Sequence, residues 1–108
     1  MVTNHVHLGI YTISQESYED FVQLAWQRMA PFKRDIPGFV SYSLTKLDNG
    51  RFVSVSIWET REQAEAARSM NAEWIKWVTG TNLADAVALQ EDLVGEMTTL
   101  AAFVRDAV

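Results

Sequence analysis

Cysteine is absent from the chain, and proline and glycine are scarce, with 2 and 5 copies among 108 residues. Without cysteine there can be no disulfide framework, no thiol catalysis and no thiolate metal site. The sequence also has no internal repeat, low-complexity tract or linker. A chain of this length has the usual size of one domain, so we expect a single domain over residues 1–108. The cytoplasm is the default location for such a cysteine-free chain.

Positive charge is also limited and dispersed. The chain has 9 Lys and Arg against 14 Asp and Glu, which gives a formal net charge of −5. Nucleic-acid binding draws on clustered positive charge for phosphate contacts, so we expect no nucleic-acid partner. No apolar run approaches the roughly 18–20 residues of a membrane span. The first ten residues, MVTNHVHLGI, lack the pattern of a secretory signal, so we expect neither a membrane span nor export.

The first third of the chain predicts a strand followed by a helix. Residues 5–13, HVHLGIYTI, are rich in β-branched and aromatic side chains, as strands are. The next stretch, SQESYEDFVQLAWQRM, changes to helical period with its apolar residues on one face. Ser14 or Ser17 can cap the start of this helix. Pro31 has no N–H to donate, so the helix should kink or end there.

Two further local signals define the middle of the chain. Residues 39–47 and 51–58 alternate like strands around Asn49-Gly50, and Asn-Gly is the strongest short signal for a hairpin. Thr60 and Gln63 have the spacing of a capping box, so a second helix should begin here and run to about residue 78.

The remaining residues predict a short third helix at 83–94 and a last strand at 96–104. The element order is then βαββα(α)β, which is the ferredoxin-like arrangement of the α+β class. Its sheet is antiparallel, and its helices pack on one face.

The two predicted sheet faces differ in composition. One is mostly aliphatic, with Val6, Leu8, Ile10, Val40, Tyr42, Leu44, Val53, Val55 and Ile57. The other is aromatic, small and histidine-bearing, with His5, His7, Gly9, Tyr11, Phe39, Ser41, Ser43, Phe52, Ser54, Ser56 and Trp58. A solvated face would normally be charged. Since the helices cover only one side, we expect a second subunit to cover this uncharged aromatic face in a homodimer.

Three stretches carry a resemblance to a known family: IPGFVSYSL after the first helix, the Asn-Gly hairpin, and SVSIWETREQAEAARSM, in which a strand ends in Trp-Glu and a capped helix begins. With them, the chain resembles small proteins of the antibiotic biosynthesis monooxygenase type in the dimeric α/β-barrel superfamily. The resemblance spans roughly residues 5–104. It implies a homodimer forming a dimeric α/β barrel, with a pocket between sheet and helices in each subunit.

The resemblance also implies several activities. Members include cofactor-free oxygenases of phenolic or quinone-forming polyketides, haem-degrading oxygenases, and proteins with no known reaction. The monooxygenase type commonly uses Asn and Trp in its pocket, with Tyr or Arg nearby. Asn71 and Trp74 occupy the corresponding helix here. Haem degraders use an Asn on the first strand and a Trp and a His in the second helix. The nearest positions of this chain carry Gly9, Ala67 and Trp77, so the resemblance disfavours haem degradation.

The stretch MNAEWIKWV, residues 70–78, supplies four candidate site residues. They belong to a stripe with helical i, i+3, i+4, i+7 spacing that consists of Ala67, Met70 or Asn71, Trp74, Trp77 and Val78. Such aromatic stripes are usually core, so the alternative is that both tryptophans only fill the interior. Asn71 would need a hydrogen-bond partner if buried, and Trp has one N–H to satisfy. We predict Asn71 and Trp74 as catalytic, and Met70 and Trp77 as substrate-binding.

The strands supply the other candidates. His5 and His7 have the spacing of a metal pair, but no third ligand is evident, so we predict no metal site. His7 is instead a candidate general base, because the pKa of histidine lies near neutral, and Tyr11 could hydrogen-bond a phenolate or carbonyl. Smallness makes Ser54, Ser56 and Gly9 candidates for leaving ligand space, or for tight packing at a dimer interface. Trp58 is predicted to exclude water from substrate.

The predicted function is therefore an oxidoreductase: a cofactor-independent monooxygenase acting on an aromatic or polyketide-like small molecule, with no metal, flavin or haem. A non-catalytic, small-molecule-binding homodimer is the alternative. Haem binding or degradation with an unusual ligand is a third, weaker one.

Overall fold

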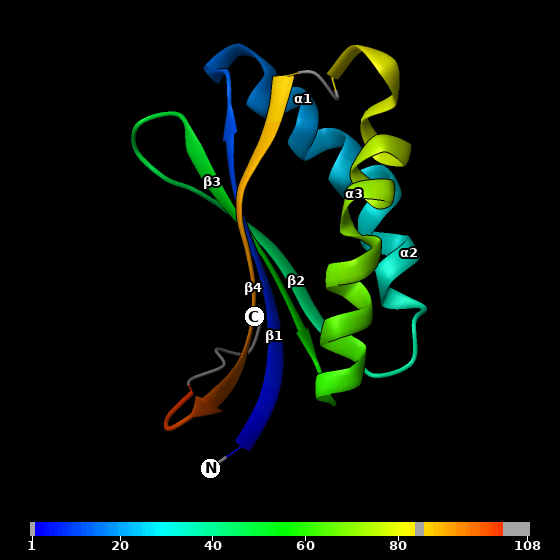
Figure 1. Cartoon of the computed structure of the whole chain (residues 1–108), viewed down its shortest axis with the longest axis vertical. Helices are drawn as coiled ribbons and strands as arrows, with labels where there is room; N and C mark the ends of the chain where they lie inside the picture. The colour runs from blue at the N-terminus through cyan, green and yellow to red at the C-terminus, as the bar shows by residue number, and fades with distance from the viewer. Residues whose placement is uncertain (1, 84–85, 103–108) are drawn as a thin grey trace, which may run out of the picture.

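A four-stranded antiparallel sheet with all its helices on one side forms the protein (Figure 1). The computed structural model describes residues 2–83 and 86–102. The strands are β1 (Val2–Ile13), β2 (Phe39–Lys46), β3 (Arg51–Trp58) and β4 (Val87–Thr99), in the spatial order β2-β3-β1-β4. The helices are α1 (Gln15–Leu24), η1 (Ala25–Met29), α2 (Ala30–Arg34) and α3 (Arg61–Leu83). This confirms the ferredoxin-like α+β fold. None of the described helices is long and apolar enough to cross a bilayer.

Local sequence chemistry forms the hairpin and the start of α3 as predicted. Asn49 and Gly50 adopt φ angles of 70° and 71°, the left-handed region that reverses the chain between β2 and β3. Gln63 N donates to Thr60 Oγ1 at 3.2 Å, and Thr60 N donates to Gln63 Oε1 at 3.1 Å. These reciprocal bonds are a capping box and satisfy two backbone donors that the helix leaves free.

The first helical segment does not end at Pro31. It widens into a π-helical turn, η1, and continues as α2 to Arg34. Proline removes one hydrogen bond of the α-helical pattern and crowds the preceding turn, and the π-helical turn directly before it accommodates both effects. Ser14 is the residue before α1, but its side chain bonds to the Ser17 hydroxyl and not to a backbone N–H.

The predicted third helix at 83–94 is wrong. Residues 87–99 form strand β4, which pairs antiparallel with β1 along nearly its whole length. The predicted last strand therefore begins nine residues earlier than residue 96. Residues 103–104 of the predicted strand and residues 84–85 of the predicted helix lie outside the described part of the chain. The local preference of ALQEDL for helix is overridden by backbone pairing with the central strand β1.

The side chains of β2 do not alternate regularly between the two sheet faces. The register with β3 shifts between Phe39 and Ser41, so Tyr42 pairs with Ser56 and Leu44 with Ser54. Residues paired across antiparallel strands share a face. Tyr42 and Leu44 therefore lie on the face of the serines, and their expected grouping with the aliphatic residues is wrong.

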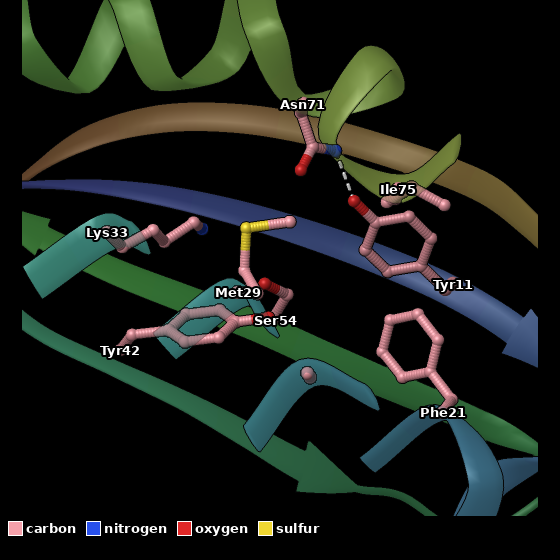
Figure 2. Close-up of a pocket in the computed structure, with 9 residues that line it drawn as sticks. Tyr11, Phe21, Met29, Lys33, Tyr42, Ser54, Asn71 and Ile75 are labelled. Atoms are coloured by element: carbon pink, nitrogen blue, oxygen red, sulfur yellow. Dashed lines mark hydrogen bonds between the residues drawn. The ribbon is translucent and has the colours of Figure 1, made fainter. Parts of the chain in front are cut away.

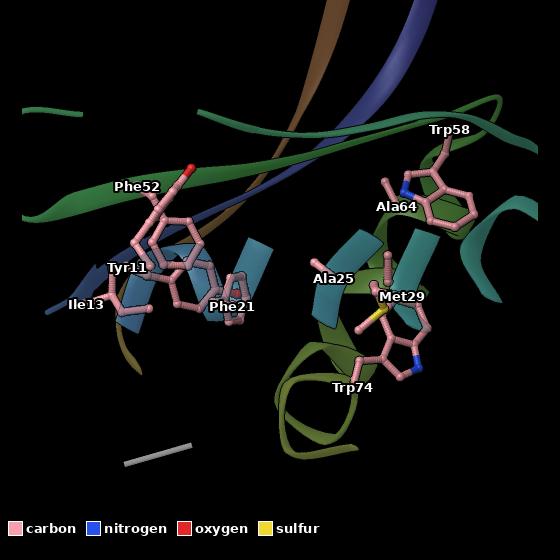
Figure 3. Packing of buried hydrophobic residues seen from close by; sticks show 11 residues of the cluster. Tyr11, Ile13, Phe21, Ala25, Met29, Phe52, Trp58, Ala64 and Trp74 are labelled. Carbon is pink, nitrogen blue, oxygen red and sulfur yellow. The ribbon is translucent and has the colours of Figure 1, made fainter. Parts of the chain in front are cut away.

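The helices cover the aromatic and histidine-bearing face, opposite to our expectation. His7, Tyr11, Phe52 and Trp58 on this face are all at most 1% exposed. Aromatic side chains fit this role because they bury large areas against the helices. The core here joins Tyr11, Phe21 and Phe52 at one end to Trp58, Met29 and Trp74 at the other (Figure 3).

No described helix covers the other face of the sheet, which is aliphatic. Its partly exposed side chains are Leu8, Ile10, Val53, Val55, Ile57, Leu93 and Met97. We call this set the open face.

Candidate functional site

A small cavity lies between the sheet and the helices (Figure 2). Its volume is about 10 Å³, the space of roughly one water molecule. The lining side chains come from three strands and all four helical segments: Tyr11, Phe21, Ala25, Met29, Lys33, Tyr42, Ser54, Asn71 and Ile75. Most of this wall is apolar, and its few polar groups come from separate elements, which is the usual composition of a ligand site.

Tyr11 and Asn71 form a buried polar pair at the cavity. Asn71 Nδ2 donates a hydrogen bond to the Tyr11 hydroxyl, which joins α3 to β1. Burial raises the pKa of Tyr11 to about 12, although the bond from Asn71 acts in the opposite direction. Tyr11 therefore stays protonated at neutral pH. Because Asn71 donates to its oxygen, the phenolic hydrogen of Tyr11 remains available for another acceptor.

Lys33 is the charged group of the cavity. Its side chain is 1% exposed and extends from α2 toward the other lining residues (Figure 2). Its Nζ atom lies 4.0 Å from the ring centroid of Tyr42 and 5.1 Å from that of Trp74. Ring faces attract cations, but they do not neutralise them. Burial accordingly lowers the pKa of Lys33 to about 7.

Tyr42 lines the cavity from strand β2. It also lines two wider grooves, of about 220 Å³ and 320 Å³, which run beside the exposed side chain of Trp26. The larger groove is lined by Trp26, Ala30, Pro31, Arg34, Phe39 and Tyr42. Burial raises the pKa of Tyr42, against the effect of a hydrogen bond with Ser54, so its hydroxyl also stays protonated.

The sequence that forms this cavity can be compared with known families. The sequence profile of antibiotic biosynthesis monooxygenases matches residues 5–78. The chain belongs to the antibiotic biosynthesis monooxygenase family. The match spans β1 to α3 and therefore includes every residue that lines the cavity. No protein of curated function matches the sequence significantly.

Solved structures of this family share the fold at low sequence identity. A Bordetella bronchiseptica protein assigned as an antibiotic biosynthesis monooxygenase has a TM-score of 0.65 and 13% identity, covering 93% of this chain and all of its own. A monooxygenase from the ActVA-Orf6 gene of Streptomyces coelicolor, in complex with nanaomycin D, has a TM-score of 0.58 and 18% identity over 96% and 94% of the chains. The haem degrader MhuD of Mycobacterium tuberculosis, with two haems in its active site, has a TM-score of 0.61 and 17% identity over 93% and 99%.

The structure brings Tyr11, Asn71 and Ser54 together at the cavity and leaves His7 outside its lining. His7 Nε2 contacts Asp92 Oδ1 on β4, and Arg68 on α3 reaches the other oxygen of Asp92 at 3.9 Å. Burial lowers the pKa of His7 below its usual 6.5, although Asp92 acts in the opposite direction. Among the described residues there is no group of three possible metal ligands.

The other predicted residues have different surroundings. Trp58 Nε1 donates to Ser56 Oγ at 3.0 Å, and both side chains are buried outside the cavity. Trp74 is 8% exposed and packs edge-on against Phe32. By contrast, Trp77 is 50% exposed. Met70, 41% exposed, likewise lies outside the cavity.

Sequence reasoning missed Lys33 and Tyr42. The signal for Lys33 was available, because Phe21, Ala25 and Met29 recur every four residues and the next step is position 33. Tyr42 was assigned to the opposite face, because nothing local in the sequence indicates the register shift after Phe39.

Proposed function

We propose that this protein is a monooxygenase that acts on a phenolic or quinone-forming aromatic molecule without metal, flavin or haem. The observation that carries the proposal is the cavity wall, where Tyr11, Asn71 and Lys33 place polar groups among aromatic and aliphatic side chains. Family membership supports the reaction class, although one fold hosts several chemistries.

The chemistry needs little from the protein beyond position and charge. An electron-rich phenolate can react with dioxygen through its own ring carbon. The substrate supplies the electrons, one oxygen atom enters the product, and the other leaves as water with two hydrogens from the substrate. In this proposal Tyr11 donates to the substrate oxygen, and Asn71 holds Tyr11 in place. Trp74 and Trp58 keep neighbouring parts of the interior dry.

Ligand binding requires the cavity to enlarge, since 10 Å³ does not hold an aromatic ring. The same requirement holds for the alternative, a dimer that binds a small molecule without transforming it. Haem binding is the less supported candidate: α3 contains no histidine, and His7 is already engaged by Asp92. Haemin titration followed by absorbance tests it directly.

We also propose that a second copy of the chain covers the open face. Its aliphatic side chains span β1, β3 and β4, and contiguous apolar surface of this kind typically marks an interface. A self-complementary sheet face suits a two-fold dimer. Residence in the cytoplasm stays a prediction.

Oxygen uptake with an anthrone-type phenol tests the proposed activity. The wild-type protein should consume oxygen well above the spontaneous rate, and Asn71→Ala should lower kcat by roughly tenfold or more because Tyr11 loses its support. Ser69→Ala, on the exposed side of the same helix, is the control and should keep the rate. Specific binding of the phenol without oxygen uptake would favour the non-catalytic alternative.

A further inference from the structure

Lys33 has no acidic neighbour in the cavity. None of the nine lining residues is Asp or Glu, and within the described part of the chain no ion pair or hydrogen bond of Lys33 Nζ is found. A buried cation without a counter-charge is costly, and proteins normally pair it. The contacts of Nζ are the ring faces of Tyr42 and Trp74, which attract its charge without neutralising it.

We propose that the cavity binds acidic phenols and enols as their anions, with the Lys33 ammonium as the counter-ion. This deepens the proposed function and rests on it, since it names the ionised form of the aromatic molecule. Where the amine is neutral, the phenol O–H bond breaks, its electron pair stays on oxygen, and the proton forms a new N–H bond at Nζ. Where the amine is already protonated, the phenol releases its proton to solvent on binding.

The groups around Lys33 are consistent with the phenol as the proton donor and Lys33 as the acceptor. Tyr11 and Tyr42 both have raised pKa values, so their hydroxyls donate hydrogen bonds to a phenolate and do not compete for its proton. The other ionisable groups nearby are His7 on β1, Asp92 on β4 and Arg68 on α3, and Asp92 contacts both of the others. Lys33 is therefore the cavity group that is free to balance a ligand's charge.

Access to Lys33 is through Tyr42. The Tyr42 side chain lines the inner cavity and both outer grooves, so its rotation would join the 10 Å³ cavity to the 220 Å³ groove. Ala25 also lines both spaces and is too small to obstruct the path. Met29, a flexible side chain on the π-helical turn, can adapt to the ligand.

The test uses 4-nitrophenol, whose anion is yellow and whose neutral form is colourless. At a pH where the free probe is mostly protonated, probe bound to the wild-type protein should be yellow, measured by absorbance with the bound amount from equilibrium dialysis. Lys33→Met should weaken binding by about tenfold or more and leave the bound probe colourless. Lys46→Met, which alters a lysine outside the cavity, should behave like wild type.

A second probe separates charge from shape. The methyl ether 4-nitroanisole cannot ionise, so its affinity should differ by less than about threefold between wild type and Lys33→Met. Colourless bound nitrophenol on the wild-type protein would overturn the proposal, even if Lys33→Met did not fold, and so would no binding of either probe. The assay needs no turnover. A yellow bound probe without oxygen uptake from anthrone-type phenols would therefore reject the monooxygenase and keep the anion site.

Discussion

The phenol ring of Tyr11 lies directly over Gly9. A Cβ atom at position 9 would come within 2.6 Å of Tyr11 Cε2 and 2.7 Å of its hydroxyl oxygen. Because Gly9 has no side chain, the Tyr11 ring can lie above it. In this position the Tyr11 hydroxyl accepts a hydrogen bond from Asn71, and the ring stacks on Phe52 with 4.9 Å between the ring centroids. The space above Gly9 belongs to the protein's own tyrosine and not to a ligand.

Gly9→Ala should destabilise the protein by about 1–3 kcal/mol, because Tyr11 must leave its position. Urea unfolding measures this cost. In a Tyr11→Leu background the same substitution should cost much less, and the difference is the coupling energy of the pair. Equal costs in the two backgrounds would show that the ring is not what excludes a side chain at position 9.

Trp74 and Trp77 should differ strongly in their contribution to stability. Trp74→Ala should cost about 3–5 kcal/mol, because the indole is 8% exposed and its removal leaves a cavity. Trp77→Ala should cost about 1 kcal/mol or less, since its side chain is 50% exposed. Measuring the free energy of unfolding of each variant gives the two costs. A similar loss in both would mean that Trp77 is buried in solution.

Acid should destabilise the protein through His7. The pKa of His7 in the folded state lies below 6.5. As the pH falls through 6.5, His7 is therefore protonated in the unfolded chain before it is protonated in the folded protein. The free energy of unfolding should fall by up to about 1.4 kcal/mol per pH unit from this group. Urea titrations between neutral and mildly acidic pH should show a shallower slope in His7→Gln. Unchanged slopes would assign the acid sensitivity to other groups.

Two leucines of β4 test the proposed dimer. Leu93 pairs with Leu8 on the open face, whereas Leu89 pairs with Tyr11 on the helix-covered face, and they are 46% and 48% exposed. Leu93→Lys should shift the protein from dimer to monomer in sedimentation at micromolar concentration, because a charge in an apolar interface is costly. Leu89→Lys is the matched control and should remain dimeric. A monomeric wild-type protein would refute the dimer itself.

Local chemistry was enough to predict most of the fold. The Asn49-Gly50 turn and the bonds between Thr60 and Gln63 need only neighbours in sequence, and both were predicted at their positions. Most of strand β4 was not predicted at its position. Its residues favour a helix locally, and its strand structure comes from pairing with β1, which is far away in the chain. The faces of β2 depend on a register shift, which is a property of two strands together.

The candidate site was predictable only in part, for a related reason. Periodicity sorts the residues of β1 and α3 by face, which grouped Tyr11 with His7 and placed Asn71 beside the apolar stripe. It did not show that the helices cover the face of Tyr11. The partner of His7 could not be found while residue 92 was expected in a helix. Lys33 was not predicted, because lysine is almost never fully buried and this one lies near the end of a helix, although it continues an apolar stripe.

The π-helical turn η1 sets the direction of Lys33. In an unbroken α-helix, positions four apart drift by about 40°, so Phe21 and Lys33 would diverge by roughly 120°. A π-helical turn holds more residues per turn and takes back part of this drift, and both residues line the cavity. Deleting one exposed residue such as Gln27 would restore regular winding, and Lys33 would then follow Phe21 by eleven residues, which places the two side chains within about 20° of each other. A codon lost from this turn would therefore leave the ammonium directed at the cavity, whereas one gained would rotate it away by about 100°.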